Sequence, residues 1–188
     1  MSAFFVQVIA DSLFELLNAS VSLYRSKSDI ILLQETCGLA KTIANKNQES
    51  LPSFLSFTQN VMSIHGSKVE ISNHSEKDEN ASIRDIVRQL MILSYEGVMA
   101  FSTSKEQPNS PPSYVNETVP DIMSPMFKAL STCATNCPIF LLSLCRDGQT
   151  AGELVLLSVQ ISPSALNIAE VETSLSAVNF LEVLVSDE

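Results

Sequence analysis

The chain has 188 residues, of which 45% are hydrophobic, with only 5 Gly and no Trp. Because glycine is scarce, the composition disfavours glycine-rich phosphate loops and turn-dense sheets and favours helices. The formal net charge of -10, from 21 acidic and 11 basic residues, disfavours direct nucleic-acid binding and would attract a basic protein, although solubility alone is the simpler explanation of the acidity.

Apolar residues recur at three- and four-residue steps in segments that begin near residues 4, 28, 50, 82, 119, 149 and 169. This spacing is typical of amphipathic helices. Residues 4–24 and 28–44 predict a first helical hairpin, with Ser28 as the N-cap of its second helix. A third helix is capped by Ser50 and is expected to end near Gly66. The buried stripe expected for the first helix is Phe5, Ile9, Leu13, Leu16 or Leu17, Val21 and Tyr24.

Two polar stretches, near 66–81 and 104–118, lack an apolar rhythm, and the second contains three prolines. Both predict flexible surface loops. Between them, Ser82 is expected to cap a fourth helix of about 22 residues, in a capping-box-like arrangement. A fifth helix is expected from Thr118, with Pro120 in its first turn, where a missing amide donor costs nothing.

The C-terminal part predicts three further helical segments. A break at 136–138 precedes a short apolar helix at 138–145, helical rhythm returns at 153–159, and residues 170–185 form the last helix. Its expected buried face is Leu175, Val178, Leu181 and Leu184. Residues 1–188 therefore predict one all-α domain, an α-solenoid of antiparallel helix pairs of the HEAT/ARM type, in which each pair buries its apolar face against the next.

The sequence contains no recognisable catalytic or metal-binding pattern. Cys133 and Cys137 can share a helix face, but His65 and His74 lie in a different region, so we expect no metal site. There is no Gly-x-Ser-x-Gly turn and no Gly-x-x-x-x-Gly-Lys phosphate loop. We therefore expect no enzyme activity and no cofactor.

Nothing in the first 17 residues resembles an export signal, because this stretch has no Lys or Arg and carries Asp11 and Glu15. The longest apolar run, 138–145, is far shorter than the ~20 residues of a membrane-spanning helix. We therefore expect no membrane insertion and a reducing compartment in which the four cysteines are free thiols.

Two stretches resemble a known family. Residues 28–64, SDIILLQETCGLAKTIANKNQESLPSFLSFTQNVMSI, and residues 119–185, with VPDIMSPMFKALSTCATNCPIFLLSL followed by VETSLSAVNFLEVLV, resemble the carboxyl-terminal HEAT repeats of importin-beta-type nuclear transport receptors. The nearest branch is transportin-SR and importin-thirteen. The matching positions are Pro120, Asp121, Ile122, Phe127, Ala129, Leu130, Pro138, Phe140, Leu141, Phe180, Leu181 and Leu184.

The resemblance implies a C-terminal segment of a longer receptor, working in nucleus and cytoplasm and binding basic cargo proteins. The chain departs from the family between Leu90 and Thr118, where a whole helix is missing, and it has no counterpart of the repeats that bind the small GTPase Ran. The alternative is a non-transport helical scaffold in a multiprotein assembly. The carboxylates that a repeat stack could align into a cargo-contacting acidic surface are Glu35, Glu96, Asp121, Glu153, Glu170 and Glu172.

Overall fold

The computed structural model describes residues 3–24, 29–70, 79–104, 120–146, 153, 155–156, 158–159 and 171–185. Within these residues there is no strand, so the expected all-α class is confirmed. The elements bounded in this described part are seven α-helices and one 3-10 helix: α1 Ala3–Val21, α2 Ile30–Lys46, η2 Gln48–Ser50, α3 Leu51–Glu70, α4 Glu79–Ser104, α5 Pro120–Asn136, α6 Pro138–Arg146 and α8 Val171–Val185.

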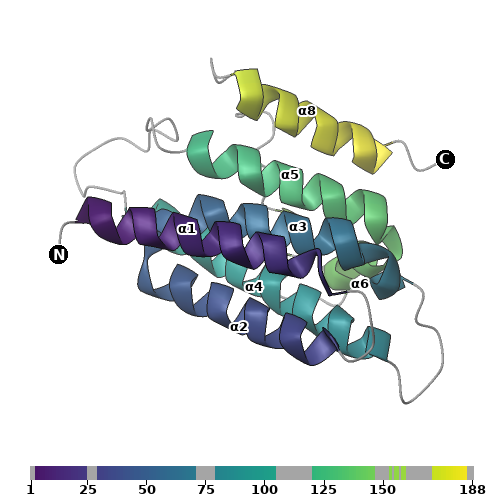
Figure 1. Cartoon of the computed structure of the whole chain (residues 1–188). Helices are drawn as coiled ribbons and strands as arrows, with labels where there is room; N and C mark the ends of the chain where they lie inside the picture. Colours follow the sequence, from purple (N-terminus) through teal and green to yellow (C-terminus); the bar gives the residue numbers. More distant parts are fainter. Residues whose placement is uncertain are drawn as a thin grey trace.

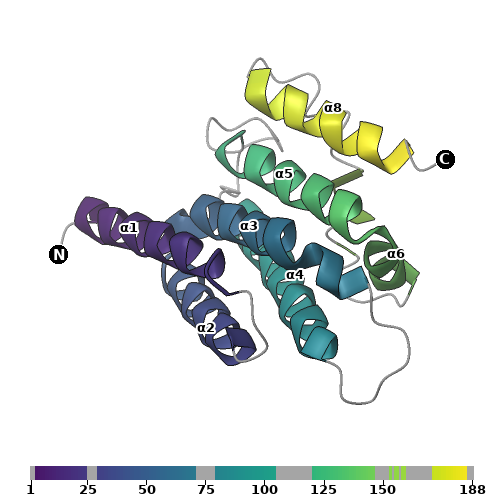
Figure 2. The ribbon, with the colours of Figure 1, turned by 45° about the vertical axis from the view of Figure 1, so that its right-hand side comes forward.

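The helices form two layers. Four of them lie side by side in a row in the order α1, α3, α5 and α8, and α2 and α4 lie beneath α1 and α3 (Figure 2). All four helices of the row run in the same direction, whereas α2 and α4 run the opposite way (Figure 1). The short helix α6 turns back and contacts α5 and α3. The row therefore has two edges, α1 at one end and α8 at the other.

The core between the layers is continuous from α1 to α8. Near α1, the ring of Phe14 packs against Phe54 and Phe57 of α3, with centroid distances of 6.4 Å and 6.2 Å. Near α8, Phe127 of α5 packs against Phe180 at 5.7 Å. Aromatic pairs at such separations stabilise a core beyond the area that they bury, so the two edge helices are anchored by the same kind of contact.

A polar seam also fixes α1 on the start of α3. Asp11 accepts hydrogen bonds from Gln7 at 3.1 Å and from Ser53 at 2.8 Å, and Asn47 donates to the Gln7 side-chain oxygen at 3.0 Å. About two turns further on, Asn60 donates to the Asn18 carbonyl at 3.2 Å. Because these groups satisfy one another, the seam sets the register of the two helices without leaving buried polar atoms unpaired.

The expected buried faces of the first and last helices are wrong in part. In α1 the core is formed by Ala10, Phe14, Leu17 and Val21, while Ile9, Leu13 and Leu16 are exposed. In α8 the buried residues are Thr173, Ser176, Ala177 and Phe180, while Leu175 and Val178 are exposed. Both helices carry apolar residues on more than one side, so the three- and four-residue steps fit either face.

Several expected boundaries also need correction. Helix α3 continues past Gly66 to Glu70, because Gly66 is a packing residue: a Cβ there would lie 2.8 Å from the Cβ of Asn136 in α5. Helix α4 begins at Glu79, so Ser82 lies inside it and is not its N-cap. The loop expected near 66–81 is therefore helical at both ends, with 71–78 outside the described residues.

The remaining boundaries agree more closely. The N-cap of α2 is Asp29, with Ser28 outside the described residues. Ser104 of the loop expected near 104–118 still belongs to α4, and Thr118 and the rest of that loop fall in the part that the structure does not describe. Pro120 lies in the first turn of α5 as expected, where it is the first residue of the helix, and in the 153–159 stretch every described residue is helical.

Candidate functional site

Glu172 of α8, one of the six predicted carboxylates, forms an intramolecular ion pair. Its carboxylate accepts a hydrogen bond from the Lys128 ammonium of α5. This bond, together with the charge of Lys128 and despite some desolvation, holds the pKa of Glu172 below its ordinary value. Because the side chains are 63% and 42% exposed, the pair adds little to stability. Its charge is largely balanced by Lys128, which weakens Glu172 as a cargo contact.

Glu153 is also engaged within the chain. The Tyr95 hydroxyl of α4 donates a hydrogen bond to the Glu153 carboxylate, and this bond, with desolvation and the nearby negative charge, raises the pKa of Tyr95. Hydrogen bonding to the neutral phenol resists its ionisation next to a carboxylate. Glu153 therefore ties its helical segment to α4.

Glu35 of α2, Glu96 of α4 and Asp121 of α5 are exposed and make no hydrogen bond or ion pair within the described residues. Asp121 stands in the first turn of its helix, where a negative charge is favourable. Glu170 lies outside the described residues. The structure thus leaves three of the six carboxylates available to a partner, distributed over both layers.

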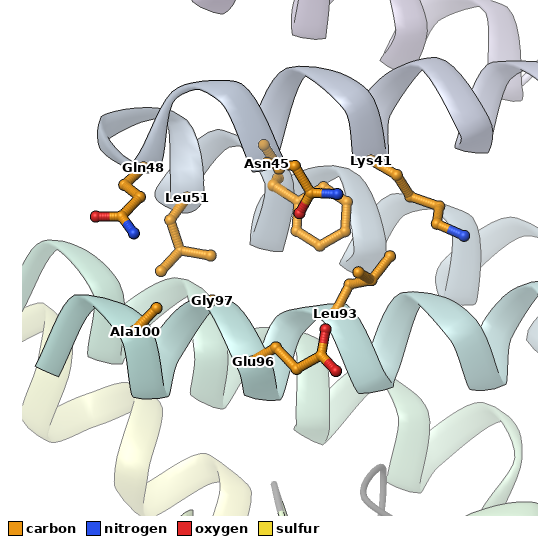
Figure 3. Close-up of a pocket in the computed structure, with 10 residues that line it drawn as sticks. Lys41, Asn45, Gln48, Leu51, Leu93, Glu96, Gly97 and Ala100 are labelled. Atoms are coloured by element: carbon orange, nitrogen blue, oxygen red, sulfur yellow. The ribbon is translucent and has the colours of Figure 1, made fainter. Parts of the chain in front are cut away.

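A shallow cleft lies where α2, η2 and the start of α3 meet α4 (Figure 3). Its apolar floor is capped by the polar side chains of Lys41, Asn45, Gln48 and Glu96. The volume is about 170 Å³, below the roughly 300–1,000 Å³ of most ligand pockets. It can accept a single side chain from a partner but is too small for most metabolites.

The close contact beneath this cleft depends on Gly97. A Cβ on Gly97 would lie 2.7 Å from a methyl carbon of Leu51, so the Leu51 side chain of α3 packs directly against the α4 backbone at Gly97. At the other end, the Lys41 ammonium donates to the Gln89 side-chain oxygen at 2.8 Å. These contacts bring Glu96 into the cleft beside α2.

Among the described residues, His65 and three of the four cysteines lie in buried surroundings. Cys133 lies near the end of α5 and Cys137 at the break between α5 and α6, so they do not share a helix, but their sulfur atoms are 3.5 Å apart and both are buried. His65 is buried, and its Nε2–H donates to the Val21 carbonyl at 3.4 Å. No group of three or more metal-ligating side chains occurs among the described residues. His74 lies outside them.

One feature that sequence reasoning missed is the exposed apolar surface at the two edges of the row. Residues such as Leu16, Leu23, Val171 and Leu175 are more than half exposed. The available signal was that Leu16 and Leu17 fit the same stripe equally well, which indicated an α1 that is apolar on more than one side.

Within the described residues, no single helix is long and apolar enough to cross a membrane. Asp121–Asn136 and Pro138–Cys145 meet the length and composition test only as a pair, and they are bent by 113° at the break between them. Comparisons with models of known protein families, with curated proteins and with solved structures found no match to this chain.

Proposed function

We propose that this chain is a protein-binding helical scaffold, a segment of a nuclear transport receptor that contributes to the recognition of basic cargo. The observation that carries the proposal is the alternation of successive helices between two layers, from α1 in one to α2 in the other and so on to α5. This is the arrangement expected of HEAT-type repeats stacked into a solenoid. Such a frame presents long helical surfaces to other macromolecules and needs no catalytic group.

The charge distribution supports a basic partner. Glu35, Glu96 and Asp121 are exposed without an intramolecular partner in the described part of the chain. The sequence after Arg146 contains no Lys or Arg at all. A field of this sign steers a cationic segment towards the chain and repels nucleic acid.

A salt titration tests the electrostatic part of the proposal. The probe is a Lys- and Arg-rich peptide, whose affinity for the whole chain is measured by fluorescence anisotropy as ionic strength rises. Binding should weaken steeply, because exposed charges are screened beyond a Debye length of about 8–10 Å at physiological salt. An affinity that stays flat with salt contradicts charge pairing as the mechanism.

A matched pair of triple variants tests the residues. Changing Glu35→Gln, Glu96→Gln and Asp121→Asn together should lower the affinity about tenfold, equivalent to about 1.4 kcal/mol. The control changes Glu15, Glu49 and Glu182 to Gln, which removes the same net charge from other exposed positions. If both triple variants lose the same affinity for the peptide, binding responds to net charge alone and these residues do not form a cargo site.

The competing proposal, a scaffold outside nuclear transport, shares the fold and the acidity. An import assay in permeabilised cells separates the two. If the chain is part of a transport receptor, it should retain a fluorescent cargo that carries a basic import signal. The amount retained should follow the peptide affinities measured for the wild type and the triple variants. Binding only to cytosolic assembly subunits, with no import cargo retained, favours the alternative.

A further inference from the structure

The cleft between α2 and α4 combines an apolar floor with a carboxylate at its rim. Leu51 and Phe54 of α3, both buried, and Leu93 of α4 line the floor. Gly97 of α4 contributes no side chain that would fill the space above them. Such a floor suits an amphipathic side chain, because the carbon stem can be buried while the polar end stays at the rim.

Glu96 brings an unbalanced negative charge to this rim. It is exposed, and its carboxylate makes no hydrogen bond or ion pair with the rest of the described chain. Lys41, the cation that also lines the cleft, donates a hydrogen bond to the Gln89 side-chain oxygen at 2.8 Å. The Lys41 ammonium points away from the Glu96 carboxylate (Figure 3). The carboxylate is therefore open to a cation supplied by another molecule.

Two neutral amides line the opposite wall of the cleft. Asn45 of α2 and Gln48 of η2 are exposed, and neither side chain is hydrogen-bonded within the described residues. Figure 3 shows Asn45 across the opening from Glu96, with Gln48 further along the wall of Asn45. Each amide carries a carbonyl oxygen that can accept a hydrogen bond. The cleft thus presents oxygen acceptors from two walls above one apolar floor.

The side chain of arginine fits this arrangement. Its aliphatic stem can lie on the floor, and its planar guanidinium carries five N–H donors that can reach acceptors on both walls. Two of these donors can pair with the two oxygens of one carboxylate, which is among the strongest hydrogen-bonding arrangements in proteins. We propose that the cleft binds one arginine side chain of a basic partner, with the guanidinium on Glu96 and the stem against Leu51 and Leu93. This inference rests on the proposed recognition of a basic partner and specifies where one of its side chains is bound.

Two other occupants fit less well. The ammonium of a lysine is a strongly hydrated point charge with three donors, and it cannot pair with a carboxylate as a planar fork. An apolar side chain would cover the floor, but it would take water from the Glu96 carboxylate without giving it a partner, which is unfavourable. Both alternatives are separate outcomes of the test.

The test measures the binding of single-residue probes to the whole isotope-labelled chain by nuclear magnetic resonance. The probes are N-acetylarginine amide, N-acetyllysine amide and N-acetylleucine amide, and the backbone amide signals of Ala44, Gly97 and Ala100, which line the cleft, report binding. The arginine probe should shift these signals with a Kd in the millimolar range. The lysine probe should bind about fivefold more weakly, because it forms fewer hydrogen bonds to the same acceptors. The leucine probe should cause no saturable shift.

Two pairs of matched variants locate the site. Glu96→Gln should weaken binding of the arginine probe about tenfold, because it removes the charge from the acceptor. Its control, Glu15→Gln, removes the same charge from an exposed position of α1 and should leave the affinity unchanged. Ala44→Leu fills the cleft and should abolish binding, whereas Ala19→Leu, at an exposed position of α1, should not. Far-UV circular dichroism checks that all four variants are folded.

Equal affinities for the arginine and lysine probes overturn the proposal. So does tighter binding of the leucine probe, which would identify the cleft as a site for an apolar side chain. An arginine probe that shifts no cleft signal, or that binds the Glu96→Gln variant as tightly as the wild type, overturns it as well.

Failure of this inference can be told from failure of the proposed function, which is judged by the basic peptide and its salt titration. A peptide that binds with the expected salt dependence, while the arginine probe does not bind in the cleft, refutes the cleft site alone. An arginine probe that binds in the cleft, while the basic peptide does not bind the chain, supports the cleft site and refutes cargo recognition.

Discussion

Replacing Phe180 by Ala should strongly destabilise the chain, because Phe180 anchors α8 on α5. Its side chain is fully buried, and its ring lies 5.7 Å from that of Phe127. Truncation of a buried Phe costs about 3–5 kcal/mol, of which the ring pair accounts for about 0.5–1.5 kcal/mol. In a domain of this size 1 kcal/mol lowers Tm by about 2–4 °C, so Tm should fall by roughly 6–20 °C.

The assay is thermal unfolding followed by circular dichroism for the wild type, Phe180→Ala, Phe127→Ala and the double variant, at a dilution where all are monomeric. The double-mutant cycle should give a coupling energy near that of the ring pair, about 0.5–1.5 kcal/mol. Leu175→Ala, on the outer side of α8 and 56% exposed, should change stability by less than about 0.5 kcal/mol. If Phe180→Ala and Leu175→Ala melt together, α8 does not unfold with the rest of the row.

Three further predictions concern His65, Cys37 and a pair of glycines, and can be measured by urea unfolding. Burial, with Lys68 contributing, lowers the pKa of His65 below 6.5. The imidazole therefore takes up a proton more readily in the unfolded state, and stability should fall as the pH drops below 6.5. The His65→Gln variant should lose this pH dependence. Burial raises the pKa of Cys37 from 9.0 to about 12. The thiol loses its proton more readily in the unfolded state, so stability should fall as the pH rises above 9.0. The buried thiol should react with iodoacetamide only when the chain unfolds. Gly38→Ala should stabilise the chain by about 1 kcal/mol, because nothing lies within 4 Å of the new Cβ. Gly66→Ala should destabilise it, because the Asn136 Cβ cannot move aside. Equal effects of the two variants would contradict this packing.

The all-helical class and most helix positions could be predicted because apolar periodicity is a local signal. Prolines placed the first turn of α5 and the start of α6 correctly, since Pro is tolerated in a first turn. Gly66 and Ser82 led to wrong helix boundaries, because the prediction again relied on residue type alone. Each is a common boundary residue, but Gly66 is needed for close packing of α3 on α5, and nothing local indicates that.

The choice of buried face could not be predicted for the edge helices. In α8 three of the four fully buried positions are Thr173, Ser176 and Ala177, which are small enough to let α8 approach α5. Ser176 also has its hydroxyl 3.2 Å from that of Ser124. A hydrophobicity pattern assigns such residues to the solvent side, so the larger Leu175 and Val178 were expected inside.

The fate of the acidic residues was equally inaccessible from sequence, because their partners are distant in the chain. Lys128, which balances Glu172, is 44 residues away from it. Tyr95 and Glu153 belong to segments on either side of two further helices. Composition gave the sign of the field correctly, but only tertiary contacts distinguish a carboxylate that is engaged within the chain from one that can meet a partner.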